Sequence, residues 1–319
     1  MQTKLHRIFL IVTGIVLVTV LMIGCSMAAD DPGTIRLSLT DAPIADAKDV
    51  EGVFITISSI EYNLNGAWIE DTGFEGPQEF NLLDLTGGTV APLTNTVISA
   101  GEVTQIRFKL DVQTDGASPR ATPGSYIVID SRGEADGVID ENDDTYELFV
   151  PSGSQTGYKA VGSFTIPSNG EVEITADFDV RKSVVKSGSK DEYILKPTIR
   201  LIVNNQAGTI DGSFTAIGSP FTVFTVFAYE DGVYTDSEAP TGTEDPETFV
   251  AFENAVSSAA VDITDGTYIL PFLAAGTYDL IVVGVGDDGS YTVIDSTTYG
   301  DILVEAETTT NRDISLTIL

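Results

Sequence analysis

Histidine and cysteine, on which many hydrolase and redox sites depend, occur only near the start of this 319-residue chain. The only histidine is His6 and the only cysteine is Cys25. Once an N-terminal leader is removed, a Ser-His-Asp or Cys-His arrangement and a His- or Cys-liganded zinc or haem site are excluded. Catalysis would have to use carboxylates, lysine, tyrosine or bound hard cations. Disulfide bonds are excluded as well, so any domain must depend on a packed core.

The segment Asp130–Asp144 concentrates carboxylates around a glycine, and its spacing resembles a calcium loop of the EF-hand or dockerin type. A sharp turn at Gly137 would fold the carboxylates inward around a hard cation that prefers oxygen ligands. The alternative is a solvated acidic hairpin loop without metal, because Arg132 stands at the first ligand position and the flanking segments are strand-like. The predicted calcium ligands are Glu134, Asp136, the Val138 carbonyl, Asp140 and Asp143.

A second group of charged residues occurs in the sequence Asp177-Phe178-Asp179-Val180-Arg181. Alternate residues of a strand project from the same face, so Asp177, Asp179 and Arg181 are predicted to form one patch. Paired carboxylates on a strand could act as cation ligands. The favoured interpretation is an ion-paired patch in which Arg181 and Lys182 neutralise the two aspartates.

The first 24 residues have the layout of a secretory signal peptide. Lys4 and Arg7 precede the apolar run Ile8–Ile23, and Gly24 follows it. The run has 16 residues, fewer than the ~20 that a membrane-spanning helix needs. A cleaved signal is therefore favoured over an uncleaved anchor helix.

Leu21-Met22-Ile23-Gly24-Cys25 resembles the bacterial lipobox, although Met22 is uncommon at its position. The resemblance implies that the Cys25 thiol is acylated and that Cys25 becomes the new amino terminus. Ser26 directly follows the cysteine. A serine rather than an aspartate at this position resembles the signal for outer-membrane delivery in enteric bacteria. Residues 25–32 are then a lipidated linker, and the expected location is the outer membrane, on its periplasmic face or at the cell surface.

The remaining chain is strongly acidic, with 14 basic and 48 acidic residues after residue 25. Such a surface repels nucleic-acid phosphates and anionic lipid headgroups, so these partners are not expected. Acidity favours solubility or binding of divalent cations and does not choose between them. The hydrophobic content of 42% is that of a globular protein rather than a disordered one.

Short alternating apolar runs separated by Gly, Pro, Asn and Asp predict antiparallel sheets and no long helix. The clearest strand is 105–111, with Ile106, Phe108 and Leu110 on the inner face. Only one or two helical turns are expected, at 46–50 or 82–85. The predicted strands are 34–40, 53–58, 105–111, 172–180 and 198–203, followed by the second unit described next.

A polar joint at 204–208 separates this region from a second unit at 208–319. The sequence DGTYILPFLAAGTYDLIVVGV resembles the prealbumin-like, or carboxypeptidase regulatory-like, domain. That resemblance implies a β-sandwich in which Tyr268 and Tyr278 pack near the turn at Ala275-Gly276, and carbohydrate binding in some relatives. Two short echoes predict that the units are related: Gly33-Thr34-Ile35 with Gly208-Thr209-Ile210, and Ile98–Arg107 with Leu273–Leu280.

The first unit resembles a bacterial lipoprotein family known as domain of unknown function 4382. The resemblance covers residues 33 to about 203 and brings no established activity. It depends on Thr40-Asp41-Ala42-Pro43, Phe80–Leu85, Asp177–Val185 and Tyr193–Pro197, in this order.

The remaining aromatic and acidic side chains of the two units are predicted to have mainly structural roles. The acidic segment Glu230–Glu247 is predicted to be a long exposed loop, and Phe221, Phe224, Phe227 and Tyr229 are predicted to pack in the core. Trp68, the only tryptophan, follows a predicted hairpin turn at Asn65-Gly66 and is expected in a core or at a strand edge.

We therefore predict an all-β protein with a signal peptide at 1–24 and β-sandwich domains at 33–204 and 208–319. A non-enzymatic binding, adhesion or scaffold role in the bacterial envelope is expected, with calcium as a candidate stabilising ion. Its partners would be the membrane, through the lipid, and a glycan or another envelope protein. The alternatives are carbohydrate binding through the second domain and, less favoured, a carboxylate-dependent glycan hydrolase.

Overall fold

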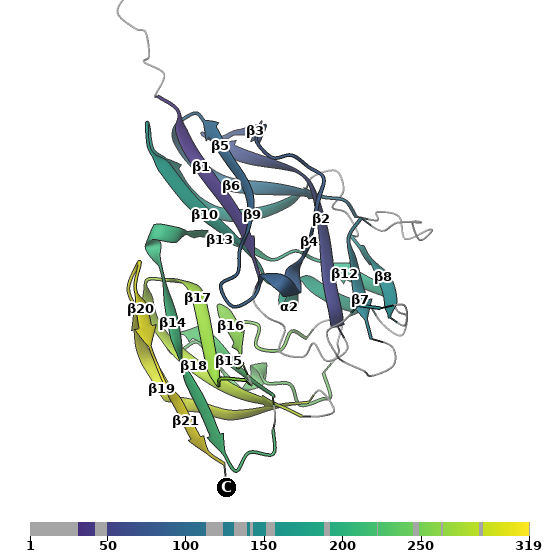
Figure 1. Cartoon of the computed structure of the whole chain (residues 1–319), viewed down its shortest axis with the longest axis vertical. Coiled ribbons are helices and arrows are strands. Elements are labelled where there is room, and N and C mark those ends of the chain that lie inside the picture. The colour runs from purple at the N-terminus through teal and green to yellow at the C-terminus, as the bar shows by residue number, and fades with distance from the viewer. Residues whose placement is uncertain are drawn as a thin grey trace, which may run out of the picture. The chain divides into compact units, whose positions relative to one another are not determined.

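The computed structural model is almost entirely β (Figure 1), which confirms the predicted fold class. No helix among the described residues is long and apolar enough to cross a membrane. The predicted signal peptide and Cys25 lie outside the described residues. These are 31–41, 50–112, 124–130, 139–140, 143–150, 157–187, 192–221, 223–244, 249–262, 264–286 and 290–318.

The described residues between 31 and 203, which we call the first domain, form thirteen strands and two short helical turns. The expected turn at 82–85 is present as a 3-10 helix, whereas the alternative at 46–50 falls mostly outside the described residues. The elements are β1 (Gly33–Thr40), β2 (Val50–Leu64), β3 (Ala67–Glu70), β4 (Gln78–Asn81), η1 (Leu82–Leu85), β5 (Ala91–Ile98), β6 (Gly101–Leu110), β7 (Tyr126–Ile129), β8 (Asp144–Phe149), β9 (Tyr158–Ile166), β10 (Glu171–Phe178), α2 (Val180–Ser183), β11 (Val184–Ser187), β12 (Glu192–Leu195) and β13 (Ile199–Val203).

These strands are hydrogen-bonded into one sheet in the order β11-β12-β8-β7-β2-β6-β9-β13-β10-β1-β5, with β3 and β4 paired to β2. Apolar residues of β1 and β10 share one core with those of β2 and β6, so distant parts of the same sheet face each other. In β2 a bulge between Ile57 and Ser59 shifts the alternation by one residue. The shift keeps Ile60, Tyr62 and Leu64 inside the core as well.

The second domain follows a single turn, η2 (Asn204–Gln206), at the predicted polar joint. In the described part of residues 207–318, two four-stranded sheets are present, β17-β14-β20 with β21 paired to β14, and β16-β15-β18-β19. Its strands are β14 (Ala207–Ile217), β15 (Val223–Glu230), β16 (Ser257–Ala260), β17 (Thr267–Ala274), β18 (Gly276–Val285), β19 (Tyr291–Val304), β20 (Thr309–Asn311) and β21 (Ile314–Thr317), with a 3-10 turn, η3, at Asp236–Glu238.

Strand β15 is buried on both faces because two apolar clusters flank its sheet. Phe224, Val226 and Ala228 pack between the two sheets, in the core of the sandwich. Phe227 and Tyr229 pack on the opposite face against the segment that follows β15. The aromatic run is therefore core, as predicted, and the two clusters explain why it is apolar at successive positions.

The sequence echo between the two units corresponds to a repeated backbone arrangement. Gly33 opens β1 and Gly208 lies at the start of β14, and each of these strands pairs in parallel with a later strand, β10 or β20. A Cβ atom would lie 2.3 Å from the Pro167 carbonyl oxygen at Gly33, and 2.3 Å from the Glu305 carbonyl oxygen at Gly208. Glycine is needed at both places because backbone approaches backbone.

The turns that face these glycines also match. Asn169 and Glu307 both have positive φ, 55° and 57°. The amide of Asn169 donates to the Pro32 carbonyl at 3.0 Å, and the amide of Glu307 donates to the Ala207 carbonyl at 2.7 Å. The second echo agrees, since Gly101 pairs with Ile166 in the first domain and Gly276 with Val304 in the second. The two domains thus use the same backbone contacts to join their first strand to the rest of the sandwich.

The turn at Ala275-Gly276 joins β17 to β18 as predicted, but only one of its two tyrosines lies there. The Tyr278 hydroxyl donates to the Ala274 carbonyl at 2.8 Å, directly at the turn. Tyr268 lies near the other end of β17, opposite Gly212, and its hydroxyl donates to the Arg312 carbonyl. The expectation that Tyr268 packs near this turn was wrong because Tyr268 and the turn lie at opposite ends of β17.

Candidate functional site

The segment around Asp177 and Asp179 does not form a continuous strand. Strand β10 ends at Phe178, and Asp179 is the N-cap of α2, where its carboxylate accepts a hydrogen bond from the Lys182 amide. The Asp179 carbonyl accepts from the Ser183 hydroxyl at 2.6 Å, and this hydroxyl accepts from the Thr198 amide at 2.9 Å. The prediction that Asp177, Asp179 and Arg181 follow one another along a strand face was therefore wrong.

Asp177 pairs instead with Arg200 on the neighbouring strand β13. Arg200 Nη2 lies 2.6 Å from Asp177 Oδ2, and Arg200 Nε lies 3.2 Å from the same oxygen. Asp177 is 5% exposed, and burial raises the pKa of its carboxyl group while Arg200 opposes the rise. Sequence spacing could not reveal this pair, because it depends on the antiparallel register that sets Asp177 opposite Arg200.

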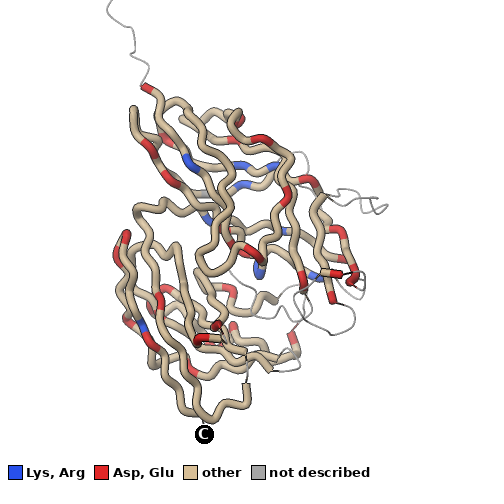
Figure 2. The backbone as a smooth tube through the Cα atoms, in the orientation of Figure 1, with Lys and Arg blue, Asp and Glu red and all other residues tan. Residues whose placement is uncertain are grey.

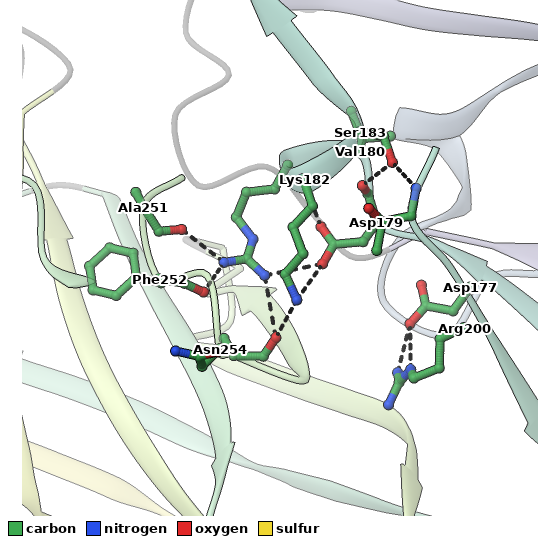
Figure 3. Close-up of polar contacts among 12 residues, drawn as sticks. Asp177, Asp179, Val180, Lys182, Ser183, Arg200, Ala251, Phe252 and Asn254 are labelled. Atoms are coloured by element: carbon green, nitrogen blue, oxygen red, sulfur yellow. Dashed lines mark hydrogen bonds and ion pairs between the residues drawn. The ribbon is translucent and has the colours of Figure 1, made fainter. Parts of the chain in front are cut away.

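Asp179 is the aspartate that Arg181 and Lys182 neutralise. Arg181 Nη2 and Lys182 Nζ each lie 3.2 Å from Asp179 Oδ2 (Figure 3). The Arg181 side chain is 7% exposed and that of Lys182 is 22% exposed. Burial lowers the pKa of Lys182, and the negative charge of Asp179 partly offsets that effect.

The same two cations reach backbone carbonyls of the second domain, and we call Arg181 and Lys182 the basic clamp. Arg181 Nη1 donates to the carbonyls of Ala251, at 2.9 Å, and Phe252. The Ala255 carbonyl accepts from Lys182 Nζ at 3.0 Å and from Arg181 Nη2 at 3.4 Å. The clamp therefore joins the first domain to a turn of the second through charge-assisted hydrogen bonds.

The turn that receives the basic clamp follows the segment Glu230–Glu247, which is predicted to be a long exposed loop. The turn packs on the β15–β18 sheet, with Phe252 fully buried and its ring 4.3 Å from that of Phe227. Glu238 is 8% exposed and accepts from the Tyr229 hydroxyl at 3.1 Å and from Asn254 Nδ2 at 3.0 Å. Most described residues of 230–244 are exposed, as predicted, and Glu238 is the exception, because the sequence does not show that Tyr229 supplies a donor to this acid.

The chemistry of this cluster is that of structural ion pairing. Each aspartate has a cationic partner, and both clamp cations are also used by carbonyl groups. A small cavity of about 10 Å³, lined by Asp177, Thr40, Ser257 and Phe272 among others, lies beside the pair. Its volume is that of about one water molecule, so it offers no room for an organic substrate.

Most of the predicted calcium ligands cannot be placed. Glu134, Asp136 and Val138 lie outside the described residues. Asp140 and Asp143 are described, and the Asp140 amide donates to Asp143 Oδ2 at 2.7 Å. Within the part of the chain that the structure describes, no three acidic side chains come together in a way that could hold a metal. The calcium site remains a prediction.

Trp68 follows the Asn65-Gly66 turn, whose positive φ angles of 50° and 85° confirm the predicted hairpin. The Arg107 guanidinium lies 3.7 Å from the centre of the Trp68 ring. Arg107 and Lys109 both pair with Glu61, at 2.7 and 2.5 Å, and hydrogen bonding from Lys109 lowers the pKa of Glu61. Trp68 thus covers an ion-paired group on the sheet surface.

Solved structures with partial similarity include the TIE protein of Bacillus anthracis, the minor pilin of Streptococcus agalactiae and the major pilin of Bacillus cereus. Each is 11% identical, and the matches cover 90%, 89% and 89% of this chain and 34%, 96% and 70% of those chains. This chain therefore spans about a third of the Bacillus anthracis protein. The TM-scores are 0.19, 0.21 and 0.19, too low to support an argument.

No curated protein matches the chain. Residues 32–197, just over half of the sequence, match the family described as a domain of unknown function (DUF4382). This range includes Asp177, Asp179 and the basic clamp and ends before the polar joint. The chain is a member of the DUF4382 family, with a second β domain after the region that the family covers.

Proposed function

We propose that this protein is a lipid-anchored, non-enzymatic component of the bacterial envelope that serves as a binding or scaffold module. The observation that carries the proposal is the basic clamp. Asp177 and Asp179, two of the ionisable residues that the sequence offered for chemistry, are buried and paired with cations, and Arg181 and Lys182 hold two β domains together. Such an arrangement suits a protein that presents surfaces at fixed positions rather than one that turns over a substrate.

The anchor is supported by the sequence Leu21–Cys25 and by the cysteine-free chain that follows it. A single fatty chain gives only marginal membrane binding, so stable anchoring needs the several acyl chains of a processed lipoprotein. Outer-membrane delivery is supported by Ser26 after the cysteine.

Mass spectrometry of the protein from native membranes tests the anchor. We expect an amino terminus at Cys25 carrying acyl chains, and a Cys25→Ala variant that is no longer processed or acylated. Ser26→Asp is the matched control, since it keeps the acylated cysteine and should change only the destination. An unmodified Cys25 in wild-type protein would contradict the proposal.

Calcium binding at 130–144 forms a separate part of the proposal, supported by the carboxylate spacing around Gly137. Calorimetric titration of residues 26–319 with calcium should show saturable binding that is lost in the Asp136→Asn/Asp140→Asn variant. Asp84→Asn, on η1, is the control. Absence of heat at millimolar calcium with wild-type protein would rule out the site.

A second candidate function is carbohydrate binding through the second domain, which a surface groove favours. The groove has a volume of about 640 Å³, within the range of small-molecule sites. Its walls offer the carboxylates of Asp211 and Asp313 and the amide of Asn311, beside the apolar Ile269. A glycan array showing binding that Asn311→Ala/Asp211→Ala abolishes would support this function, and an array without binding would refute it.

A further inference from the structure

Strand β5 ends the sheet of the first domain, and its outer edge has no strand partner among the described residues. The strand pairs only with β1. No hydrogen bond outside the β1 ladder reaches the described backbone of Ala91–Ile98. An unpaired edge presents a row of free amide and carbonyl groups that can pair with another strand.

The second half of this edge, from Thr94 to Ile98, lacks the features that protect an edge strand. Residues 86–101 contain no charged residue, although 20% of the whole chain is charged. Val97, the next-to-last residue of β5, is 71% exposed. The protective features lie near the start of β5, where Pro92 stands opposite Ser38 and the pairing with β1 has a register shift.

Other edges of the protein are better protected. Strand β19, also at the end of a sheet, carries Asp295 and Asp301, and its pairing with β18 has three register shifts. Strand β17, which occupies the position of β5 in the second domain, is approached by the β4–β5 connection. A Cβ atom at Gly87 would lie 3.8 Å from Ile269, and one at Gly88 would lie 3.6 Å from Pro271.

The inner face of β5 is fixed, so the edge is rigid and ready to pair. Thr94 and Thr96 point into the protein, and their hydroxyls donate to Asp71 Oδ1 at 3.3 and 2.8 Å. The other oxygen of Asp71 accepts from the Tyr62 hydroxyl at 2.7 Å. Asp71 is 4% exposed, and it ties β5 to the middle of the sheet through β2.

We propose that the β5 edge is the interface with a second copy of this chain, paired antiparallel about a two-fold axis. The acidic surface of one copy repels most of the surface of another, because 48 acidic residues face 14 basic ones after residue 25. The uncharged edge avoids this repulsion, and a two-fold contact requires only that the strand be compatible with itself. The occupant is therefore the chain itself.

Sedimentation of residues 26–319, which contain every described element, tests the interface. We expect a monomer–dimer equilibrium at micromolar to millimolar concentration that shifts toward the dimer as NaCl increases, since salt screens the repulsion between copies. Val97→Lys should raise the dissociation constant about tenfold or more, because it adds a charge of the same sign to the uncharged edge of each copy.

The control variant is Leu303→Lys, at a residue that is 58% exposed on β19, the edge strand described above as protected. It adds the same charge and should leave the dimer intact. Hydrogen exchange should show β5 amides that gain protection with protein concentration. A wild-type protein that stays monomeric in 0.5 M NaCl at about 1 mM, or a dimer that Val97→Lys does not weaken, would overturn the proposal.

Discussion

In the first domain, three carboxylates of low exposure face cations and the buried Asp71 faces hydroxyl donors, whereas in the second domain the buried Glu238 faces neutral donors only. Asp177, Asp179 and Glu61 each pair with an arginine or lysine. Glu238 accepts instead from Tyr229 and Asn254. Composition explains the difference, because residues 208–319 contain 19 acidic residues and a single basic one, Arg312, as Figure 2 shows by its scarcity of blue there.

Tyrosine takes the place of the missing cations in the second domain. The hydroxyls of Tyr268, Tyr278 and Tyr299 each donate to a backbone carbonyl. Burial is the main reason that the pKa values of Tyr268 and Tyr278 are raised. Both hydroxyls therefore remain protonated donors at neutral pH. The two domains share backbone contacts but differ in how far cations, rather than neutral donors, satisfy their buried polar groups.

The largest expected effect comes from removing the cation that serves both domains. Arg181→Ala leaves Asp179 with only Lys182 and removes the guanidinium from the carbonyls of Ala251 and Phe252. Breaking a buried pair in this way costs about 3–5 kcal/mol, to be measured by urea unfolding. Arg36→Ala, at a pair that is 51% exposed, should cost about 1 kcal/mol or less. Equal costs would show that the clamp is not a structural contact.

A smaller effect is expected from the neutral donor in the second domain. Tyr229→Phe removes a hydrogen bond to the buried Glu238 and should cost about 1.5–3 kcal/mol in thermal or urea unfolding. Tyr158→Phe is the matched control. The buried Tyr158 hydroxyl has no hydrogen-bond partner among the described residues, so its removal should be neutral or stabilising. A neutral Tyr229→Phe would remove the distinction between the domains.

The shared backbone scheme predicts similar costs at two distant glycines. Gly33→Ala and Gly208→Ala each place a methyl group 2.3 Å from a carbonyl oxygen, which forces the backbone apart. We expect about 1–3 kcal/mol for each substitution in urea unfolding. Gly232→Ala separates the packing cost from the conformational one, because Gly232 has positive φ but no atom within 4 Å of the added Cβ. A tolerated Gly33→Ala beside a costly Gly208→Ala would show that the likeness is superficial.

The sequence predicted the features that depend on local pattern, and missed those that depend on register. Period-two alternation identified the strands, and the glycine echoes identified the repeat. The end of β10 was missed because Asp179 fits a strand as well as an N-cap until Ser183 and Thr198 are placed beside it. Arg200 was missed because its partner is 23 residues away in sequence. The burial of Glu238 was missed because acidity alone indicates exposure.

The smallest effect distinguishes the two domains by their response to salt. Hydrogen bonding from Lys109 lowers the pKa of Glu61, and donors including Asn254 and Tyr229 lower that of Glu238 despite its burial. Each glutamate therefore stabilises the fold above its unfolded pKa, and this contribution is lost as the pH falls through the lowered folded pKa.

Only the contribution of Glu61 depends on cations. Glu61→Gln should therefore cost about 1 kcal/mol or less at pH 7 and low salt, and less again in 0.5 M NaCl, because Lys109 is partly exposed and is screened. Glu238→Gln should cost the same at both salt concentrations, since its partners are uncharged. Urea unfolding of the two variants at pH 7 and pH 3 measures both effects. Equal salt dependence of the two variants would mean that the carboxylates of the two domains are stabilised by the same long-range charges, because hydrogen bonds from neutral donors are not screened.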